Sequence, residues 1–150
     1  MARGTYFSDF EVEQAFTSGG RTITEADVVA FAGISGDFNP LHTDQTFAEK
    51  TPFGQRIAHG MLCASVSTGL GQTLGIFEGT TLALMSQTFE YKAPVFFGDT
   101  IRLRLTVEKT TPSSRGGKGV VLFRSDILKQ DDTVCTTGTW TVLFRDGKPS

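Results

Sequence analysis

The hydrophobic residues of this 150-residue chain change their spacing near its midpoint. From His59 to about Leu74, small and apolar residues occupy most of a helical wheel, which is typical of a buried helix. Between residues 101 and 108, apolar and polar residues alternate strictly, as they do in an antiparallel strand with one buried face. A long helix followed by such strands restricts the chain to folds in which a sheet covers one helix.

Three further segments have the same strand character, and residues that favour turns separate them. They are Leu82–Lys92, Val120–Leu128 and Val134–Phe144, and we expect a fifth strand near Ala15–Ile23. The breaks between them are rich in Pro, Gly and Asp. We therefore predict an α+β fold in which a curved antiparallel sheet of about five strands wraps a long central helix.

A shorter helix is predicted ahead of the central one. Thr24 is a suitable N-cap, acidic residues follow it in the first turn, and Gly33 and Gly36 mark the probable end. From Gly36 to roughly Gly60 the chain is polar and interrupted by prolines, with at most one helical turn near residues 47–50. A loop this long in a compact domain usually carries function.

Length and charge narrow the class of protein. The chain is expected to form one domain over residues 1–150. Its net charge of −2, without a basic stripe, disfavours nucleic acid as a partner. Cys63 and Cys135 have no metal-binding spacing and are expected to be buried free thiols, which suits a reducing compartment. No segment has the features of a membrane span or a targeting signal, so we expect a cytoplasmic protein without membrane insertion.

The segment from Ser35 to His42 holds the chemistry-bearing residues. Pro40 prevents a continuous helix between Asp37 and His42, so a turn is expected to bring the two side chains together. A carboxylate and an imidazole that converge on one water can act as a base and an acid. A turn-capping aspartate with a hydrogen-bonded histidine is the structural alternative.

His59 and Gly60 stand where the central helix begins. The free N–H groups of a helix start can bind an oxyanion, and glycine leaves room for a ligand to approach. The alternatives are close packing of Gly60 against a strand and a helix-end hydrogen bond for His59. The two histidines and Asp37 lack typical zinc or iron spacing, so no metal site is expected.

The run FAGISGDFNPLHTDQTFA resembles the active-site signature of MaoC-like dehydratases and (R)-specific enoyl-CoA hydratases. Further on, FGQRIAHGML resembles the family's entry into its central helix, and FFGD resembles its later turn into a sheet strand. That resemblance implies a hot-dog fold, usually dimeric, with two sheets joined edge to edge. It also implies that Asp37 and His42 hold the reacting water, that the Gly60 amide binds the thioester carbonyl, and that Asn39 positions the pair. The remaining expected substrate contacts are Ser35, Phe53, His59 and Arg56, and candidates for the CoA phosphates are Arg56, Lys92, Arg102 and Arg104.

The function that the resemblance implies is reversible addition of water to a trans-2-enoyl-CoA, which gives the (R)-3-hydroxyacyl-CoA. The acyl-CoA is then a substrate, and no cofactor is expected. Four alternatives stay open: dehydration of 3-hydroxyacyl groups on acyl carrier protein, dehydration of a branched or dicarboxylic acyl-CoA, a hot-dog thioesterase, and a non-catalytic acyl-CoA-binding domain. A homodimer or a higher homo-oligomer is expected in each case.

Overall fold

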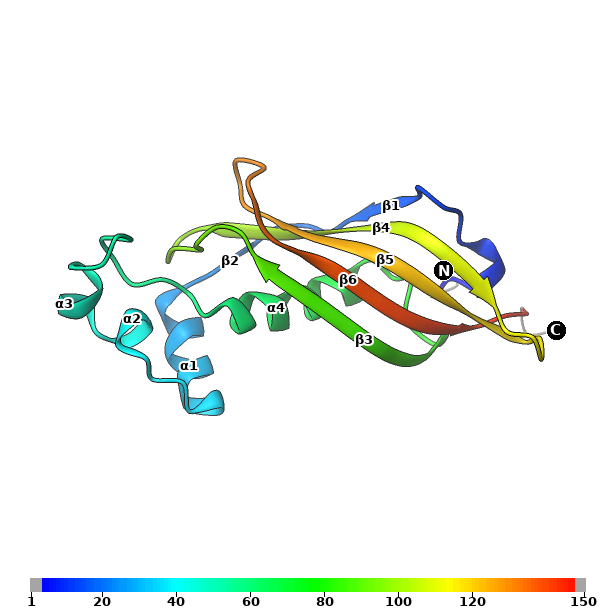
Figure 1. Ribbon diagram of the computed structural model, residues 1–150, viewed down its shortest axis with the longest axis horizontal. Helices are drawn as coiled ribbons and strands as arrows, with labels where there is room; N and C mark the ends of the chain where they lie inside the picture. The colour runs from blue at the N-terminus through cyan, green and yellow to red at the C-terminus, as the bar shows by residue number, and fades with distance from the viewer. Residues whose placement is uncertain (1–3, 148–150) are drawn as a thin grey trace.

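The computed structural model describes residues 4–147, and these form one antiparallel sheet with a long helix on one face (Figure 1). The helices are α1 (Glu25–Ser35), α2 (Pro40–Thr43), α3 (Gln45–Ala48) and α4 (Gly60–Thr73), with a short 3-10 helix, η1, at Phe7–Asp9. The strands are β1 (Ala15–Thr17), β2 (Arg21–Thr22), β3 (Thr81–Tyr91), β4 (Thr100–Pro112), β5 (Lys118–Leu128) and β6 (Val134–Arg145). The strand order is β1-β4-β5-β6-β3, and β2 also pairs with β4. The predicted α+β architecture is confirmed.

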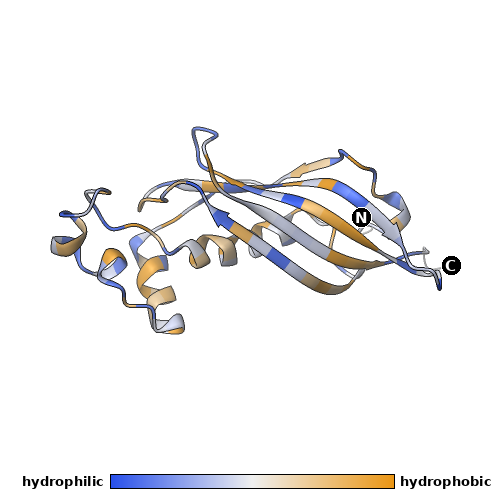
Figure 2. Cartoon of the chain, in the orientation of Figure 1, coloured by the Kyte–Doolittle hydropathy of each residue, from blue (hydrophilic) through white to orange (hydrophobic). Residues whose placement is uncertain are grey.

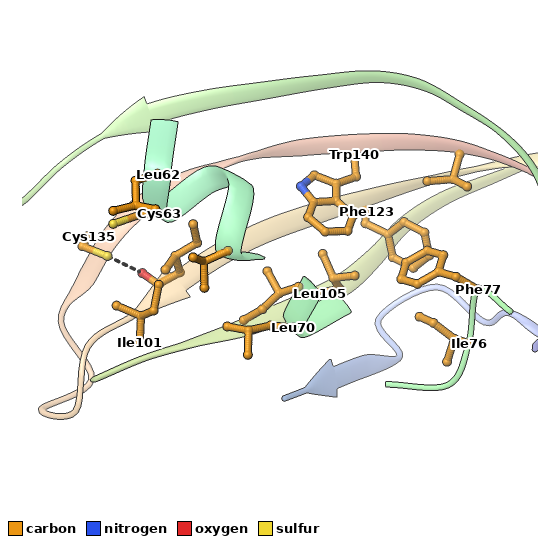
Figure 3. Packing of buried hydrophobic residues seen from close by; sticks show 14 of the residues in the cluster. Leu62, Cys63, Leu70, Ile76, Phe77, Ile101, Leu105, Phe123, Cys135 and Trp140 are labelled. Carbon is orange, nitrogen blue, oxygen red and sulfur yellow. Dashed lines mark hydrogen bonds between the residues drawn. The ribbon is translucent and has the colours of Figure 1, made fainter. Parts of the chain in front are cut away.

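Strands β4, β5 and β6 have inward-facing apolar residues that alternate with more exposed ones along much of their length, and Figure 2 shows the hydropathy of the strands. These inward residues pack with α4 and make a single core, part of which Figure 3 shows. Cys63 and Cys135 are buried free thiols in that core, as predicted. No helix of the described residues is long and apolar enough to cross a membrane.

The expected first strand is two strands instead of one. β1 and β2 both pair with β4, and residues 18–20 interrupt them. Within this gap the Ser18 N–H donates to the carbonyl of Leu103, and the Ser18 hydroxyl accepts from the Leu103 N–H. The hydroxyl of Ser18 thus takes the place of a backbone carbonyl in the ladder.

α1 has the predicted start and end. Thr24 and Asp27 form a reciprocal capping box, and Gly36 closes the helix in the left-handed conformation. α4 begins one residue after the predicted His59, but it is not buried all round as its composition indicated. Side chains on one face of α4 are exposed in this single chain, namely Met61, Ser65, Thr68 and Gln72. The prediction of an all-round buried helix was wrong because the sheet covers only one side.

β3 is a free edge of the sheet and is 11 residues long. Three large apolar side chains on it are exposed: Leu82, Leu84 and Met85. Long apolar edges are uncommon in isolated domains because their unpaired backbone groups promote association. The exposed face of α4 and the β3 edge are therefore the parts of the chain that lack a covering layer.

Candidate active site

The site begins where α1 ends. Gly36 has a φ of 77°, a conformation that glycine adopts without steric cost, and it turns the chain away from the helix axis. The Asp37 N–H then donates to the Ser35 hydroxyl, which itself donates to the Phe31 carbonyl. Asp37 Oδ1 accepts from the Asn39 N–H at 3.1 Å. These short-range bonds fix the aspartate in a compact turn.

Pro40 starts a helical turn at this point. It occupies the first position of α2, where a missing N–H costs nothing. Asn39 caps α2 by accepting from the Leu41 N–H, and α3 follows directly after α2. The long loop thus contains two one-turn helices, and the expectation of at most one turn near residues 47–50 was wrong. Asn39 joins both parts of the site, since its N–H binds Asp37 and its side chain caps the helix of His42.

His42 is held by a backbone carbonyl from outside its own segment. Its Nδ1 lies 2.7 Å from the carbonyl oxygen of Ile57, so Nδ1 carries the hydrogen and donates it. In the neutral ring the other nitrogen, Nε2, then has a free lone pair. His42 is one of the residues that line a cavity beside this segment. This arrangement gives a proton acceptor a fixed orientation at a cavity wall.

His59 lies directly behind His42. It is 2% exposed, and its ring stacks on that of His42 with centroids 3.9 Å apart. The Phe31 ring meets its edge at 4.9 Å, and Nε2 donates to the Asp37 carbonyl at 2.9 Å. His59 therefore joins the start of α4 to the turn that carries the carboxylate. Its ring packs against His42 and does not line the cavity. This position differs from the substrate contact that was expected for His59.

Asp37, His42 and His59 each place a possible ligand atom within 4.8 Å of the other two. One nitrogen of each imidazole is already bonded to a carbonyl. Imidazole lone pairs lie in the ring plane, so two rings stacked at 28° do not aim their remaining nitrogens at one tetrahedral ion. The cluster suits proton transfer better than tetrahedral coordination.

Gly60 is the first residue of α4, so its N–H has no partner within the helix. The Tyr91 ring covers it so closely that an added Cβ would lie 2.6 Å from Tyr91 Cε1. Gly60 therefore meets both expectations for this position: it lines the cavity, and it is closely packed against a strand. Burial raises the pKa of Tyr91, which keeps its hydroxyl protonated near neutral pH.

The cavity beside these residues has a volume of about 580 Å³. Apart from His42, its walls come from the loop before α4, the start of α4, the end of β3, the segment that follows β3 and the start of β6, and they include Phe53, Ile57, Met61, Cys63, Pro94 and Val95. Burial raises the pKa of Cys63 to about 12, so this thiol is not a thiolate nucleophile at neutral pH. A mostly apolar wall with a few polar groups at one end is typical of a small-molecule site.

The other expected contacts are dispersed. Phe53 lines the cavity, but the Ser35 hydroxyl is used inside the turn. Arg56 forms an ion pair with Glu25 at 2.6 Å and lies over the Phe97 ring, and it is not a lining residue. Of the CoA-phosphate candidates, Lys92 lines the cavity and pairs with Glu90 at 2.9 Å.

Arg102 and Arg104 lie elsewhere. Both form ion pairs on β4, Arg102 with Asp132 and Arg104 with Asp126, and neither lines the cavity. The expectation that they contact CoA phosphates therefore finds no support in their positions. The alternating pattern of β4 already assigned both side chains to the polar face of the strand.

Tyr91 and Thr136 line the cavity and were missed from the sequence. They are direct partners across β3 and β6. Tyr91 ends a predicted strand and Thr136 belongs to a row of threonines, so neither residue stands out locally. Only the register of β3 against β6, together with the contact between Tyr91 and Gly60, brings them to the site.

The fold and the site define a class: a hot-dog protein with an imidazole and a carboxylate gathered at the first turn of its central helix. Within that class, the family model for the MaoC like domain matches residues 9–125, and the chain belongs to this family.

Relatives of known name support the assignment. The chain is 40% identical over 139 residues to an (R)-specific enoyl-CoA hydratase of Rhodospirillum rubrum, covering 92% of this chain and 85% of that one. It is 40% identical over 114 residues to a 3-hydroxybutyryl-CoA dehydratase of Methylorubrum extorquens, covering 75% and 70%. The solved (R)-hydratase of Aeromonas caviae matches with a TM-score of 0.73 and 34% identity over 89% of this chain and 96% of that one.

Proposed function

We propose that this protein is an (R)-specific enoyl-CoA hydratase, which reversibly adds water to a trans-2-enoyl-CoA and forms the (R)-3-hydroxyacyl-CoA. The observation that carries the proposal is that a carboxylate oxygen of Asp37 and a ring nitrogen of His42 lie within 4.8 Å of each other, and that His42 and Gly60 line the adjacent cavity. The names of two relatives, an (R)-specific hydratase and a 3-hydroxybutyryl-CoA dehydratase, describe this reaction in its two directions.

The chemistry follows from the two acceptors. A water between them donates one O–H to the Asp37 carboxylate and the other to His42 Nε2, which directs an oxygen lone pair at the β-carbon of the substrate. One of these protons passes to its acceptor as the C–O bond forms, the other stays on the oxygen as the new hydroxyl, and the pair returns the proton that it took up to the α-carbon. Water is thereby consumed without any redox change. Each such proton transfer typically contributes about 10²–10⁴-fold in rate.

The helix start supplies the other half of the mechanism. Negative charge develops on the thioester oxygen while the β-carbon is attacked, and the N–H of Gly60 can donate to it. Loss of one such donor typically costs about 10²–10³-fold. The reaction needs no cofactor, because the thioester itself stabilises the carbanion.

A homodimer completes the proposal. The apolar β3 edge and the open face of α4 would both be covered if two copies joined β3 to β3, so that two sheets become one. Leu84→Asp places a charge on that edge and should shift the protein toward monomers in light scattering. Glu90→Gln, a change at an exposed residue of the same strand, is the control.

We place this enzyme in the cytoplasm, where buried free thiols stay reduced.

The test is hydration of crotonyl-CoA, followed by the loss of enoyl-thioester absorbance. Coupling to a dehydrogenase specific for (R)-3-hydroxyacyl-CoA reports the configuration of the product, and a free-thiol assay detects thioester hydrolysis. Product of the (R) configuration without thiol release supports the proposal. Thiol release without hydration would instead identify a thioesterase, and inactivity on every enoyl thioester would reject the function.

A further inference from the structure

A second cavity, of about 130 Å³, lies against the later half of α4. Its walls come from α4, β3 and β6, with Phe77 behind them. Four buried side-chain nitrogen or oxygen atoms in residues 4–147 have no hydrogen-bond partner in the protein, and three of them belong to residues that line this one cavity: Thr81 Oγ1, Gln87 Nε2 and Trp140 Nε1. The fourth, His59 Nδ1, is at the active site.

This coincidence indicates a ligand site because an unpaired buried polar group is costly, at about 1–3 kcal/mol. Trp140 is 4% exposed, and in Figure 3 its indole nitrogen points away from the neighbouring Phe123 ring. The indole packs closely on Gly71, where an added Cβ would lie 3.1 Å from the Trp140 ring. The donor is therefore enclosed between α4 and the sheet.

The ligand chemistry follows from the three groups. An indole N–H only donates, a glutamine nitrogen only donates, and a hydroxyl does either. The cavity thus offers at least two donors to an acceptor. No charged side chain lines it, so a buried carboxylate would lack a compensating cation. A neutral oxygen, such as a hydroxyl, keto or ether oxygen, fits these donors.

The second cavity lies along the same helix and strand as the active site. Thr68, on its wall, follows Gly60 by eight residues of α4, which is about 12 Å at ~1.5 Å per residue. Gln87 precedes Tyr91 by four residues of β3, or about 13 Å at ~3.3 Å per residue. A zigzag carbon chain with bonds of ~1.5 Å advances ~1.3 Å per carbon, so about ten bonds span this distance.

We propose that the second cavity binds the far end of the acyl group and selects enoyl thioesters that carry a neutral oxygen acceptor about ten bonds from the thioester carbon. The oxygen accepts from Trp140 Nε1 and Gln87 Nε2. The inference rests on the proposed function for the identity of the ligand as an acyl thioester. It goes beyond that function because it assigns a polar specificity to the distal end of the chain.

The kinetic test compares 10-hydroxy-trans-2-decenoyl-CoA with trans-2-decenoyl-CoA. We expect the wild type to favour the hydroxylated substrate by about tenfold or more in kcat/KM, since one retained hydrogen bond is worth about that factor. Trp140→Phe and Gln87→Leu, tested separately, should each bring the ratio toward one or below it. Thr88→Val is the matched control, because the side chain of the neighbouring residue faces the other side of the sheet and should leave the ratio unchanged.

A second test does not depend on turnover. Trp140 is the only tryptophan of the chain, so a ¹⁵N-labelled sample gives one indole N–H resonance. We expect 10-hydroxydecanoyl-CoA to move this resonance downfield and decanoyl-CoA to move it less or in the opposite direction. Equal shifts with both thioesters would overturn the proposal even if Trp140→Phe does not fold, and Gln87→Leu should reduce the downfield shift.

The two proposals fail in different ways. Inactivity toward crotonyl-CoA rejects the proposed function, and the indole titration then decides the cavity assignment alone. Hydration of crotonyl-CoA with equal rates on the two ten-carbon thioesters, or with no turnover of either, rejects the polar end site and leaves the hydratase intact.

Discussion

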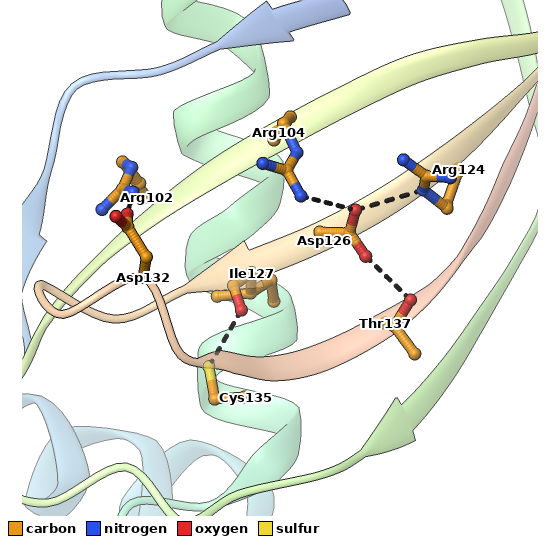
Figure 4. Close-up of polar contacts among 8 residues, drawn as sticks. All are labelled: Arg102, Arg104, Arg124, Asp126, Ile127, Asp132, Cys135 and Thr137. Atoms are coloured by element: carbon orange, nitrogen blue, oxygen red, sulfur yellow. Dashed lines mark hydrogen bonds and ion pairs between the residues drawn. The ribbon is translucent and has the colours of Figure 1, made fainter.

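Two polar clusters of this chain each contain an aspartate, but they differ in how many hydrogen bonds the protein makes to it. On the outer face of the sheet, Asp126 accepts from Arg104 at 3.3 Å, from Arg124 at 3.2 Å and from Thr137 at 2.9 Å, as Figure 4 shows. At the helical end, Asp37 accepts from one backbone N–H, and His42 keeps one ring nitrogen free. A polar cluster is therefore available for chemistry where some of its hydrogen-bond acceptors have no partner within the protein.

Removing each carboxylate should therefore affect a different property, either stability or activity. In the outer-face cluster the carboxylate stabilises the fold, because two guanidinium groups would otherwise face each other. In the helical-end cluster we propose that the carboxylate serves the reaction, and we expect its loss to leave the packing intact. Stability and activity should therefore separate cleanly between the two sites.

The largest expected effect is on activity at the helical end. Asp37→Asn and His42→Gln should each lower kcat for crotonyl-CoA hydration by about 10²–10⁴-fold while changing the unfolding midpoint little. Asp131→Asn, in the exposed β5–β6 turn, is the matched control and should keep full activity. Unchanged hydration in both variants would remove these residues from the mechanism.

Gly60→Ala should have the next largest effect. The added methyl would collide with the Tyr91 ring, which displaces the helix start and its N–H, so we expect kcat/KM to fall by about 10²–10³-fold. Combining Gly60→Ala with Tyr91→Ala removes the collision and should restore part of the activity. If the double variant is no better than the single one, the steric explanation is wrong.

Asp126→Asn should act on stability alone. The free energy of unfolding should fall by about 1–3 kcal/mol in urea titrations, because two arginines lose the negative charge of their buried carboxylate partner. Hydration at a temperature well below the transition should be unaffected. A loss of activity with unchanged stability would contradict the division between the clusters.

Acid offers a smaller test of the same division, at another satisfied carboxylate. Burial alone would raise the pKa of Asp99, but hydrogen bonds from Gln130, Lys129 and the Phe96 N–H, with the charge of Lys129, lower it below its usual range. A lowered pKa means that its contribution to stability is present above the unfolded value and is lost as pH falls through the folded value. The stability difference between wild type and Asp99→Asn should therefore shrink from about pH 6 to about pH 3.

The measurement is urea unfolding at both pH values, with Glu108→Gln as the control for a simple change of net charge. Glu108 is exposed on β4, so its removal should give a small difference at either pH. An Asp99→Asn difference that stays constant across this range would mean that the carboxylate is not held by its partners.

Much of the fold was predictable because its causes are local. The Thr24 capping box, the alternation along β4 and the glycine that ends α1 each depend on neighbours a few residues apart. The interruption at residues 18–20 and the exposed face of α4 were not predictable, because both depend on how the sheet meets other elements. The helix α2 was missed because Pro40 breaks a helix in its interior but starts one at its first position, whereas α3 overlaps the turn expected near residues 47–50.

Neighbouring residues alone account for the turn that holds Asp37, and the motif from Phe31 to Leu62 carries the resemblance that pointed to the proposed acid–base pair. The surroundings of these residues depend on tertiary contacts. The Ile57 carbonyl fixes the tautomer of His42, the His59 ring supports it from behind, and Tyr91 covers Gly60. The reason is physical: near neighbours set backbone turns, whereas strand register and helix packing set which distant groups share a cavity, and which buried donors stay unpaired.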